Sequence, residues 1–248
     1  MDSTSCQMGT DKLILRILNG RTDHVLDLIK KGSSISERDN DGVTLIQWCA
    51  YYGDVSAIKL LLDHGASLTD LGENYDLNGA CFHGHWRLVQ FLLESGADAN
   101  HSLPGTGETP LHAAQSHADS LSSGHVTKLL LACDANPNAL TVPAMETGSF
   151  MRDVRTKGES PLHRAAAFSS YDTISMLLEA GADKTQKDAT GETPLSWASW
   201  HLRPAGILHL LCYAHHKIHP EQVKKFTSDH GNGSANGMNV NLLGNIVE

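Results

Sequence analysis

The sequence has few cysteines, no long apolar run and no excess of basic residues. Its five cysteines are scattered over 248 residues without a CxxC pair, which argues against a disulfide framework and indicates reduced thiols. There is no run of about 18 apolar residues, and the first residues lack the basic and apolar regions of a secretion signal. We therefore expect neither membrane insertion nor export, and we predict a cytoplasmic protein.

The charge balance and the missing motifs exclude further classes of protein. Lys and Arg number 19 against 28 Asp and Glu, a net charge of −9, so nucleic acid and anionic membranes are poor candidate partners. No G-x-S-x-G, H-E-x-x-H, Walker or Rossmann fingerprint is found in the sequence. We expect no catalytic residue, no cofactor and no bound metal ion.

A repeat dominates what the sequence does contain. GESPLHRAA begins at Gly158 and GETPLSWAS begins 33 residues later at Gly191, while GETPLHAAQ begins at Gly107 and the weaker GVTLIQWCA at Gly42. A leucine-rich trio follows each of these four segments. A fifth trio lies between the segments that begin at Gly42 and Gly107. The middle residues of the trios are Leu61, Leu92, Leu130, Leu177 and Leu210. A fixed period of this length indicates a stack of similar units.

Each mark of the repeat has a local structural meaning. A Thr or Ser opens each segment, and its hydroxyl can accept a hydrogen bond from the free N–H groups of a first helical turn. Pro follows it in three segments, at a helical position where a missing N–H does no harm. The leucine trio supplies the buried stripe of a second helix, and a Gly after it, as at Gly65, Gly96 and Gly181, suits the left-handed end of that helix.

These segments resemble the ankyrin repeat, with its pattern G-x-T-P-L-H-x-A-A followed by V-x-x-L-L-x-x-G-A-D. The resemblance implies an all-α solenoid of about six helix-turn-helix units with hairpin-like turns, in which each unit contacts only its neighbours. It also implies that His112 and His163 form hydrogen bonds within and between units. We expect the repeat domain at 10–219, with units at about 10–41, 42–74, 75–106, 107–156, 157–189 and 190–219. Residues 220–248 are expected to be a mostly disordered extension.

Two units depart from the pattern. In the third, YDLN at 75–78 stands where Thr-Pro-Leu-His is expected, which predicts a weaker helix start and a flexible joint. The fourth is 51 residues long, 18 more than the period of 33. We place four of the extra residues in a loop near 118–124 between its helices and the other 14 in a long inserted finger loop at 139–156. Asp134 replaces the final glycine of this unit, which predicts an irregular helix end.

In the ankyrin family the inner helices and turn tips line a concave face, and those positions are rich in aromatic residues here. Such residues are typical of binding hot spots, so we expect a monomer that binds a protein partner. The inner-helix candidates are Trp48, Tyr51, Tyr52, Phe82, His83, Arg164, Phe168, Trp197, Trp200 and His201. The finger candidates are Met145, Phe150, Met151, Arg152, Asp153 and Arg155. The alternatives are that the rings pack between inner helices and that the finger folds back over the fourth and fifth units.

The alternative function is a small-molecule or zinc site, with possible catalysis, in the C-terminal unit. Its candidate ligands are His209, Cys212, His215, His216 and His219. Helical spacings of three and four would place His209, Cys212 and His216 on one face. The cluster also fits the polar outer face of a terminal unit, and we favour that interpretation.

A short motif in the third unit indicates a possible modification. Leu92, Asp98 and Asn100 fit L-x5-D-x-N, which resembles the context in which turn asparagines of ankyrin repeats are hydroxylated in animal cells. Asn100 is therefore a candidate for hydroxylation wherever such a hydroxylase is present.

Overall fold

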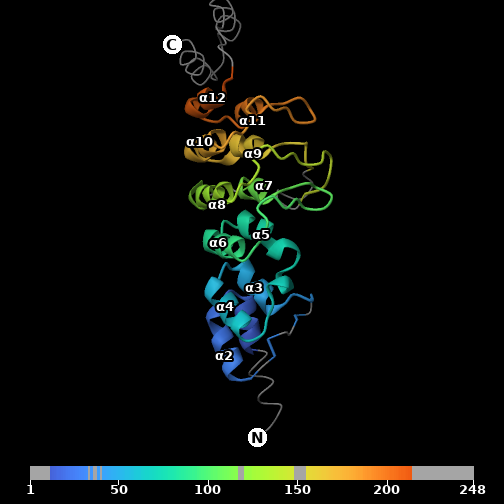
Figure 1. The fold of residues 1–248 in the computed structure, drawn as a ribbon, viewed down its shortest axis with the longest axis vertical. Coiled ribbons are helices and arrows are strands. Elements are labelled where there is room, and N and C mark those ends of the chain that lie inside the picture. Colours follow the sequence, from blue (N-terminus) through green and yellow to red (C-terminus); the bar gives the residue numbers. More distant parts are fainter. Residues whose placement is uncertain are drawn as a thin grey trace, which may run out of the picture.

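The computed structural model of the chain describes residues 12–32, 34–35, 38–39, 41–116, 120–147 and 155–213. These residues form an elongated stack of helix pairs, in which the first helices of the pairs lie in one column and the second helices in another (Figure 1). The turns that join successive pairs project from the side of the first column. The all-α repeat architecture predicted from the sequence is confirmed.

The first helix of each pair is called inner and the second outer. The inner helices are residues 12–18, α3 (Leu45–Tyr51), α5 (Leu77–Phe82), α7 (Pro110–Ala114), α9 (Pro161–Phe168) and α11 (Pro194–Trp200). The outer helices are α2 (Val25–Lys30), α4 (Val55–Asp63), α6 (Trp86–Glu94), α8 (Ser120–Ala132), α10 (Tyr171–Glu179) and α12 (Ala205–Leu211). Short 3-10 helices are η1 (Thr22–His24), η2 (Leu68–Leu71) and η3 (Glu73–Asp76).

The inner helices begin at the Thr or Ser of the repeat. The hydroxyl and the backbone N–H of Ser160 both bond Nδ1 of His163, at 2.9 and 3.1 Å, and α7 has the same arrangement at His112. Because a backbone N–H can only donate, Nδ1 of each histidine accepts and Nε2 carries the proton. Nε2 then donates to a backbone carbonyl of the next unit, that of Glu159 for His112 and that of Glu192 for His163, each at 3.1 Å. The predicted role of both histidines is confirmed.

The hydrophobic core runs along the stack and is built from the leucine trios. The middle leucines that are fully buried are Leu61, Leu92, Leu130 and Leu177. In the last pair Leu211 is buried in place of the expected Leu210, which is only partly buried. The reason is that α12 begins 12 residues after Thr193, whereas α10 begins 11 residues after Ser160.

The loop predicted near 118–124 is wrong for residues 120–124, which belong to α8. This helix has 13 residues where α4, α6 and α10 have 9, so the four extra residues add about one helical turn. The added turn packs on the preceding pair, where a Cβ at Gly84 would lie only 2.8 Å from the Cβ of Ser122. The surplus of the fourth unit is therefore taken up partly by regular structure.

Asp134 ends α8 as regularly as glycine ends other outer helices, so the predicted irregular helix end is also wrong. Asp134 has φ 57°, the left-handed conformation that aspartate tolerates better than most residues. The N–H of Ala135 donates to the carbonyl of Leu130 at 3.0 Å, the same bond that Ala66 makes to Leu61 after α4.

Asparagine side chains join successive turns of the stack. Asn100 donates from Nδ2 to the carbonyl of Asp134 at 2.9 Å and accepts at Oδ1 from the N–H of Asn136 at 2.7 Å. Asn138 bonds the turn after α10 in the same way. The side-chain amide of Asn100 therefore has a structural role in the turn, and its hydroxylation stays a prediction.

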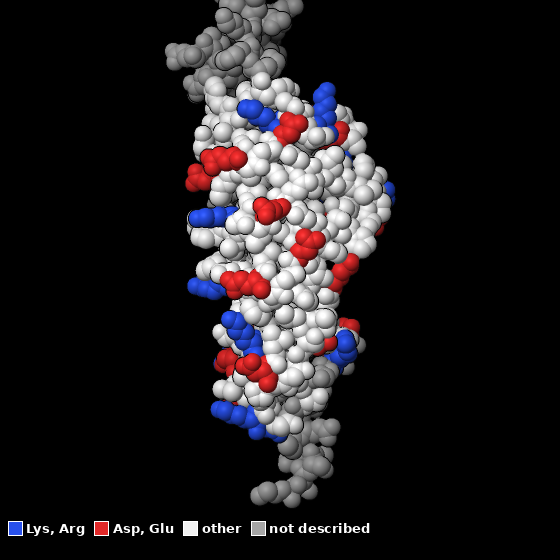
Figure 2. Space-filling view, viewed as in Figure 1, with Lys and Arg blue, Asp and Glu red and all other residues white. Residues whose placement is uncertain are grey.

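The surface and the helix lengths agree with the composition. Figure 2 shows Lys and Arg interspersed with Asp and Glu on this face of the described residues, so no single sign of charge dominates it. No helix in the described part of the chain is long and apolar enough to cross a membrane.

Candidate partner-binding surface

Helical spacing gathers three aromatic side chains on one side of α3. Tyr51 and Tyr52 follow Trp48 by three and four residues, and the three ring centroids lie 5.1 to 6.3 Å from one another. The cluster continues across to α5, because the ring of His83 lies 5.0 Å from that of Tyr51 and that of Phe82 lies 5.2 Å from that of His83. Five of the candidate side chains therefore meet in one place, which we call the ring cluster.

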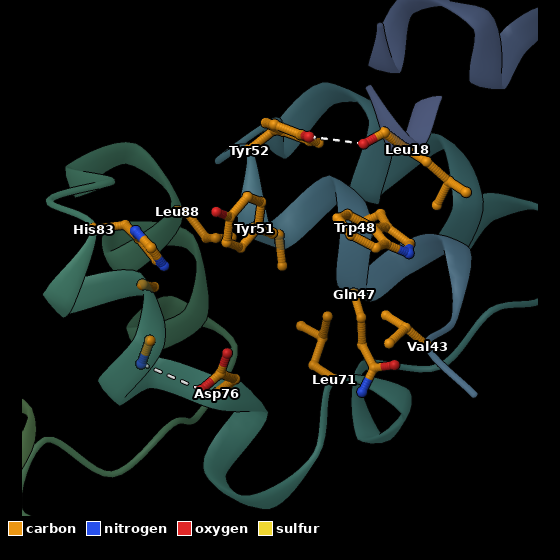
Figure 3. A pocket seen from close by; sticks show the side chains of 13 residues that line it. Leu18, Val43, Gln47, Trp48, Tyr51, Tyr52, Leu71, Asp76, His83 and Leu88 are labelled. Atoms are coloured by element: carbon orange, nitrogen blue, oxygen red, sulfur yellow. Dashed lines mark hydrogen bonds between the residues drawn. The ribbon is translucent and has the colours of Figure 1, made fainter. Parts of the chain in front are cut away.

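A cavity of about 560 Å³ opens beside the ring cluster, between α3 and α5 (Figure 3). Trp48 lies on its α3 side, Asp76 and His83 lie on its α5 side, and the ring of Tyr51 lies between them. Tyr51 and Tyr52 are 53% and 37% exposed, so a partner can reach both rings. Cavities of this size hold small ligands or short segments of another chain.

The unusual start of the third unit shapes this cavity. The sequence predicts a departure here, and Asn74, Tyr75 and Asp76 have φ of 49°, 54° and 52°, so the chain enters α5 through η3 in a left-handed conformation. Asp76 nevertheless caps α5, since its Oδ1 accepts from the N–H of Gly79 at 3.2 Å. A Cβ at Gly79 would lie 2.4 Å from Oδ2 of Asp76, so only glycine leaves room for the carboxylate at this point.

Asp76 gives the cavity its charge. Among the described residues that line the cavity it is the one carboxylate, and no Lys, Arg or His of the described residues forms an ion pair with it. Its side chain is exposed at the cavity, yet the surrounding protein desolvates it and raises its pKa above the ordinary value for aspartate. The structure thus places an unpaired carboxylate next to several aromatic rings.

Trp48 and Trp197 also hold the turns that precede their helices. The indole N–H of Trp48 donates to Asp39 at 2.8 Å, and that of Trp197 donates to Asp188 at 3.0 Å. Both carboxylates also accept from backbone N–H groups of their own turns. The pattern D-x-x-G-x-T-x-x-x-W, present at 39–48 and 188–197, is the sequence signal that could have revealed this structural role.

A second group of candidate rings lies at the other end of the inner column. The rings of Phe168 and His201 lie 4.9 Å apart, and Trp200 is 78% exposed. Because α5, α7 and α9 lie between α3 and α11 in the stack, these residues form a surface separate from the ring cluster (Figure 1).

Comparison with known proteins decides the family. The family model for ankyrin repeats (three copies) matches residues 13–102 and 77–223, which together span most of the chain. The chain belongs to the ankyrin repeat family. This result confirms the resemblance on which the fold prediction rests.

Several curated proteins contain a similar ankyrin repeat region. The putative palmitoyltransferase ZDHHC13 of Danio rerio is 29% identical over 199 residues, which are 78% of this chain and 28% of that protein. Ankyrin repeat and SOCS box protein 3 of Homo sapiens is 32% identical over 207 residues, which are 79% of this chain and 35% of that protein. Rabankyrin-5 of Mus musculus is 33% identical over 135 residues, 47% of this chain and 11% of that protein. The chain spans about a third or less of the length of these relatives.

Arg164 does not lie on the concave face of this ankyrin repeat protein, so its prediction as a partner-binding residue is wrong. Its side chain is 0% exposed between α7 and α9. Nη2 of Arg164 lies 2.6 Å from Glu159 and 2.7 Å from Glu108, and both carboxylates are also buried. The 33-residue period placed Arg164 on the inner helix correctly. Its burial could not be predicted from that period, because Glu108 lies 56 residues away in the sequence and only the folding of the chain brings it close to Arg164.

Residues 139–147, which we call the finger base, fold back on the ankyrin stack. The hydroxyl of Thr147 donates to Glu108 at 2.8 Å, and that of Thr141 donates to Glu159 at 2.7 Å. These are the carboxylates that bind Arg164, so the finger base and α9 share one buried polar network. For these residues the structure follows the alternative in which the finger covers the fourth and fifth units.

The finger candidates are only partly placed. Met145 is 38% exposed, and Arg155 is exposed and lies 3.4 Å from Glu146. Phe150, Met151, Arg152 and Asp153 lie outside the described residues.

The two Ser/Thr–His pairs of the repeat are unsuited to catalysis. The 2.9 Å distance from Ser160 to His163 resembles that between a nucleophile and its base, but the exposed fractions are 1% and 0%. Both ring nitrogens of His163 are engaged in hydrogen bonds, and burial lowers its pKa. Burial and the nearby Arg164 lower the pKa of His112 to about 3. These histidines are therefore neutral structural groups.

The described residues contain no group of three or more His, Cys, Asp or Glu placed to hold a metal ion. The helix expected to align His209 with Cys212 ends at Leu211, and Cys212 is extended, with ψ 135°. Cys212 is the C-cap of α12, three residues after His209, so only these two members of the predicted helical face lie within the described residues. His215, His216 and His219 lie outside the described residues.

Proposed function

We propose that the chain is a non-catalytic protein-binding module and that the ring cluster, with the cavity beside it, is its main contact surface. Ankyrin repeats generally mediate protein–protein interaction. The observation that carries the proposal is the meeting of Trp48, Tyr51, Tyr52 and His83 around an open cavity on the inner helices.

The physical chemistry of the ring cluster supports this choice. Tyrosine and tryptophan offer large contact areas at a low cost in side-chain entropy, and they dominate binding hot spots. Here the hydroxyl of Tyr52 donates to the carbonyl of Leu18 at 2.8 Å, and Trp48 is held by Asp39. Trp48 and Tyr52 are thus held in place before a partner arrives, so little ordering entropy opposes binding at these two rings.

The transferase activity named for the zebrafish relative is not part of this proposal. The chain spans 28% of the length of that protein, and the Ser–His and Thr–His pairs of the described residues are buried. The alternative of a zinc site at the C-terminal unit stays a prediction, because three of its five candidate ligands lie outside the described residues.

Selection from a phage-displayed library of random peptides tests the proposal. Purified protein should enrich peptides whose affinity falls by on the order of 2 kcal/mol, about 30-fold, on Tyr51→Ala substitution. Tyr171→Ala is the matched control, because Tyr171 is 51% exposed, close to the 53% of Tyr51, and lies on outer helix α10. Peptides that bind wild type and the Tyr51 variant equally would show that the surface is wrongly chosen.

A further inference from the structure

We infer, resting on the proposed function, that the cavity between α3 and α5 receives a lysine or arginine side chain of the bound partner, with Asp76 as its counter-ion. The partner segment would lie across the ring cluster and insert this one basic side chain.

The carboxylate of Asp76 is available for such a contact. Its Oδ1 caps α5 through the N–H of Gly79, while no described residue donates a hydrogen bond to Oδ2. Figure 3 shows the side chain at the edge of the cavity, across from Trp48. A carboxylate in partly desolvated surroundings binds a cation more strongly than one in bulk water does.

The rings of the cavity are suited to the same cation. Ammonium and guanidinium groups are attracted to the faces of Trp and Tyr within about 6 Å of the ring centroid. The chain uses this contact elsewhere, since Nζ of Lys157 lies 5.3 Å from the ring centroid of Trp197, the residue equivalent to Trp48. No cation of the described residues lies in this way over Trp48, Tyr51 or Tyr52.

The size and the remaining lining of the cavity fit a long basic side chain. Leu71, Ala80 and Leu88 provide apolar surface for its methylene groups, and Asp76 and the rings surround its charged end. A volume of about 560 Å³ exceeds one side chain, so there is room for the flanking backbone of the partner.

Titration of the isotopically labelled full chain with single amino-acid probes tests the inference directly. N-acetyl-lysine amide and N-acetyl-arginine amide should shift the amide signal of Gly79 and the ring signals of Tyr51 and His83. N-acetyl-norleucine amide, which lacks the charge, should cause shifts only at a concentration about tenfold higher. Equal binding of the norleucine probe overturns the inference.

Asp76→Asn isolates the charge. Asparagine tolerates the left-handed conformation at φ 52° and can still accept from the N–H of Gly79, so we expect the fold to be unchanged. Binding of the lysine and arginine probes should weaken about tenfold. Asp134→Asn is the matched control, since Asp134 is an exposed, left-handed aspartate away from the cavity, and it should leave both affinities unchanged.

The selected peptides separate failure of this inference from failure of the proposed function. Enrichment of Lys or Arg at one fixed position, lost when the selection is repeated on the Asp76→Asn protein, supports both. Peptides that depend on Tyr51 but carry no fixed basic residue and ignore Asp76→Asn overturn the inference and leave the proposed function in place. Peptides that ignore Tyr51→Ala overturn the proposed function itself.

Discussion

At the scale of single residues, the buried charges between α7 and α9 are the most sensitive point of the molecule. Arg164 lies between Glu108 and Glu159, and all three side chains are at most 2% exposed. Burial alone would raise the pKa of Glu159, but Arg164 and hydrogen bonds lower it to about 2. The positive charge of Arg164 therefore offsets the repulsion between two carboxylates that are buried close to each other.

Replacing Arg164 should destabilise the protein strongly. Arg164→Met keeps much of the side-chain volume but leaves Glu108 and Glu159 facing each other, so we expect a loss of about 3–5 kcal/mol in the free energy of unfolding. Urea unfolding followed by circular dichroism measures it. Arg155→Met is the control, because Arg155 pairs with Glu146 on the surface and should change stability by less than about 1 kcal/mol. Equal effects of the two variants would contradict this account.

The residues that could be predicted are those whose role depends on local spacing. The caps at His112 and His163 and the ring cluster on α3 follow from neighbours within a few residues. Arg164 could not be placed in this way, because its burial depends on a carboxylate from another unit. The charge of the cavity was missed because Asp76 was interpreted only as a departure from the Thr-Pro start.

At the scale of elements, α8 shows tertiary packing overriding local propensity. The sequence ADSLSSG at 118–124 is rich in small polar residues that favour loops, yet residues 120–124 are helical. The close approach of Ser122 to Gly84 gives these residues a surface on which to pack. A glycine in one unit thus permits a longer helix in the next.

Gly84→Ala should separate this packing from backbone strain. Gly84 has φ 69°, so alanine adds both left-handed strain and a clash with Ser122, for a total of about 2–4 kcal/mol. Gly32→Ala is the matched control, because Gly32 has φ 70° with nothing within 4 Å, and it should show the strain alone, about 1–2 kcal/mol. Thermal unfolding compares the two variants. If Ser122→Gly does not restore part of the loss in the Gly84 variant, the clash is not its cause.

The hydroxyl of Thr147 should help to hold residues 139–147 of the finger against the stack. Thr147→Val removes its hydrogen bond to Glu108 in a buried site, at a cost of about 1–3 kcal/mol, so amide hydrogen exchange at 139–147 should become faster. Thr185→Val, in an exposed turn, serves as the control and should leave exchange in the finger unchanged. Unaltered exchange in the Thr147 variant would show that other contacts hold the finger base.

At the scale of the whole molecule, the stack has two contrasting junctions between inner helices. Between α7 and α9 a buried network of charges and hydroxyls fills the space, whereas between α3 and α5 an open cavity remains. Because each unit of a solenoid contacts only its neighbours, each junction affects the stability of its own region most.

Acid should weaken the α7–α9 region first. The pKa of His112 is about 3 in the folded protein and 6.5 when unfolded, so between these values the unfolded state binds more protons and stability falls as pH falls. Glu159, with a folded pKa of about 2 against 4.5, adds a further loss below pH 4.5. We expect stability to fall by about 1 kcal/mol per pH unit from His112 alone between pH 6 and 4. Hydrogen exchange at each pH should show loss of protection at 108–116 and 157–169 before α3 and α4.

His112→Gln tests the source of this acid sensitivity. Gln47 already fills the equivalent position in α3, where its Oε1 accepts from the N–H of Thr44 at 2.8 Å, so glutamine can keep the cap without titrating. The variant should show a flatter dependence of unfolding free energy on pH above 4.5. An unchanged slope would assign the sensitivity to another group.

The extra turn of α8 carries a lesson for engineering repeat proteins. Four residues advance a helix by about 400° and 6 Å, so a chain that enters one turn earlier still approaches from nearly the same side. The residues that follow the added turn keep the same sides toward their neighbours, so the packing of the helix on the following unit does not have to change. Modules of this kind can therefore be lengthened by about one full turn at the start of the outer helix, whereas one or two added residues would rotate the connection away from its neighbour.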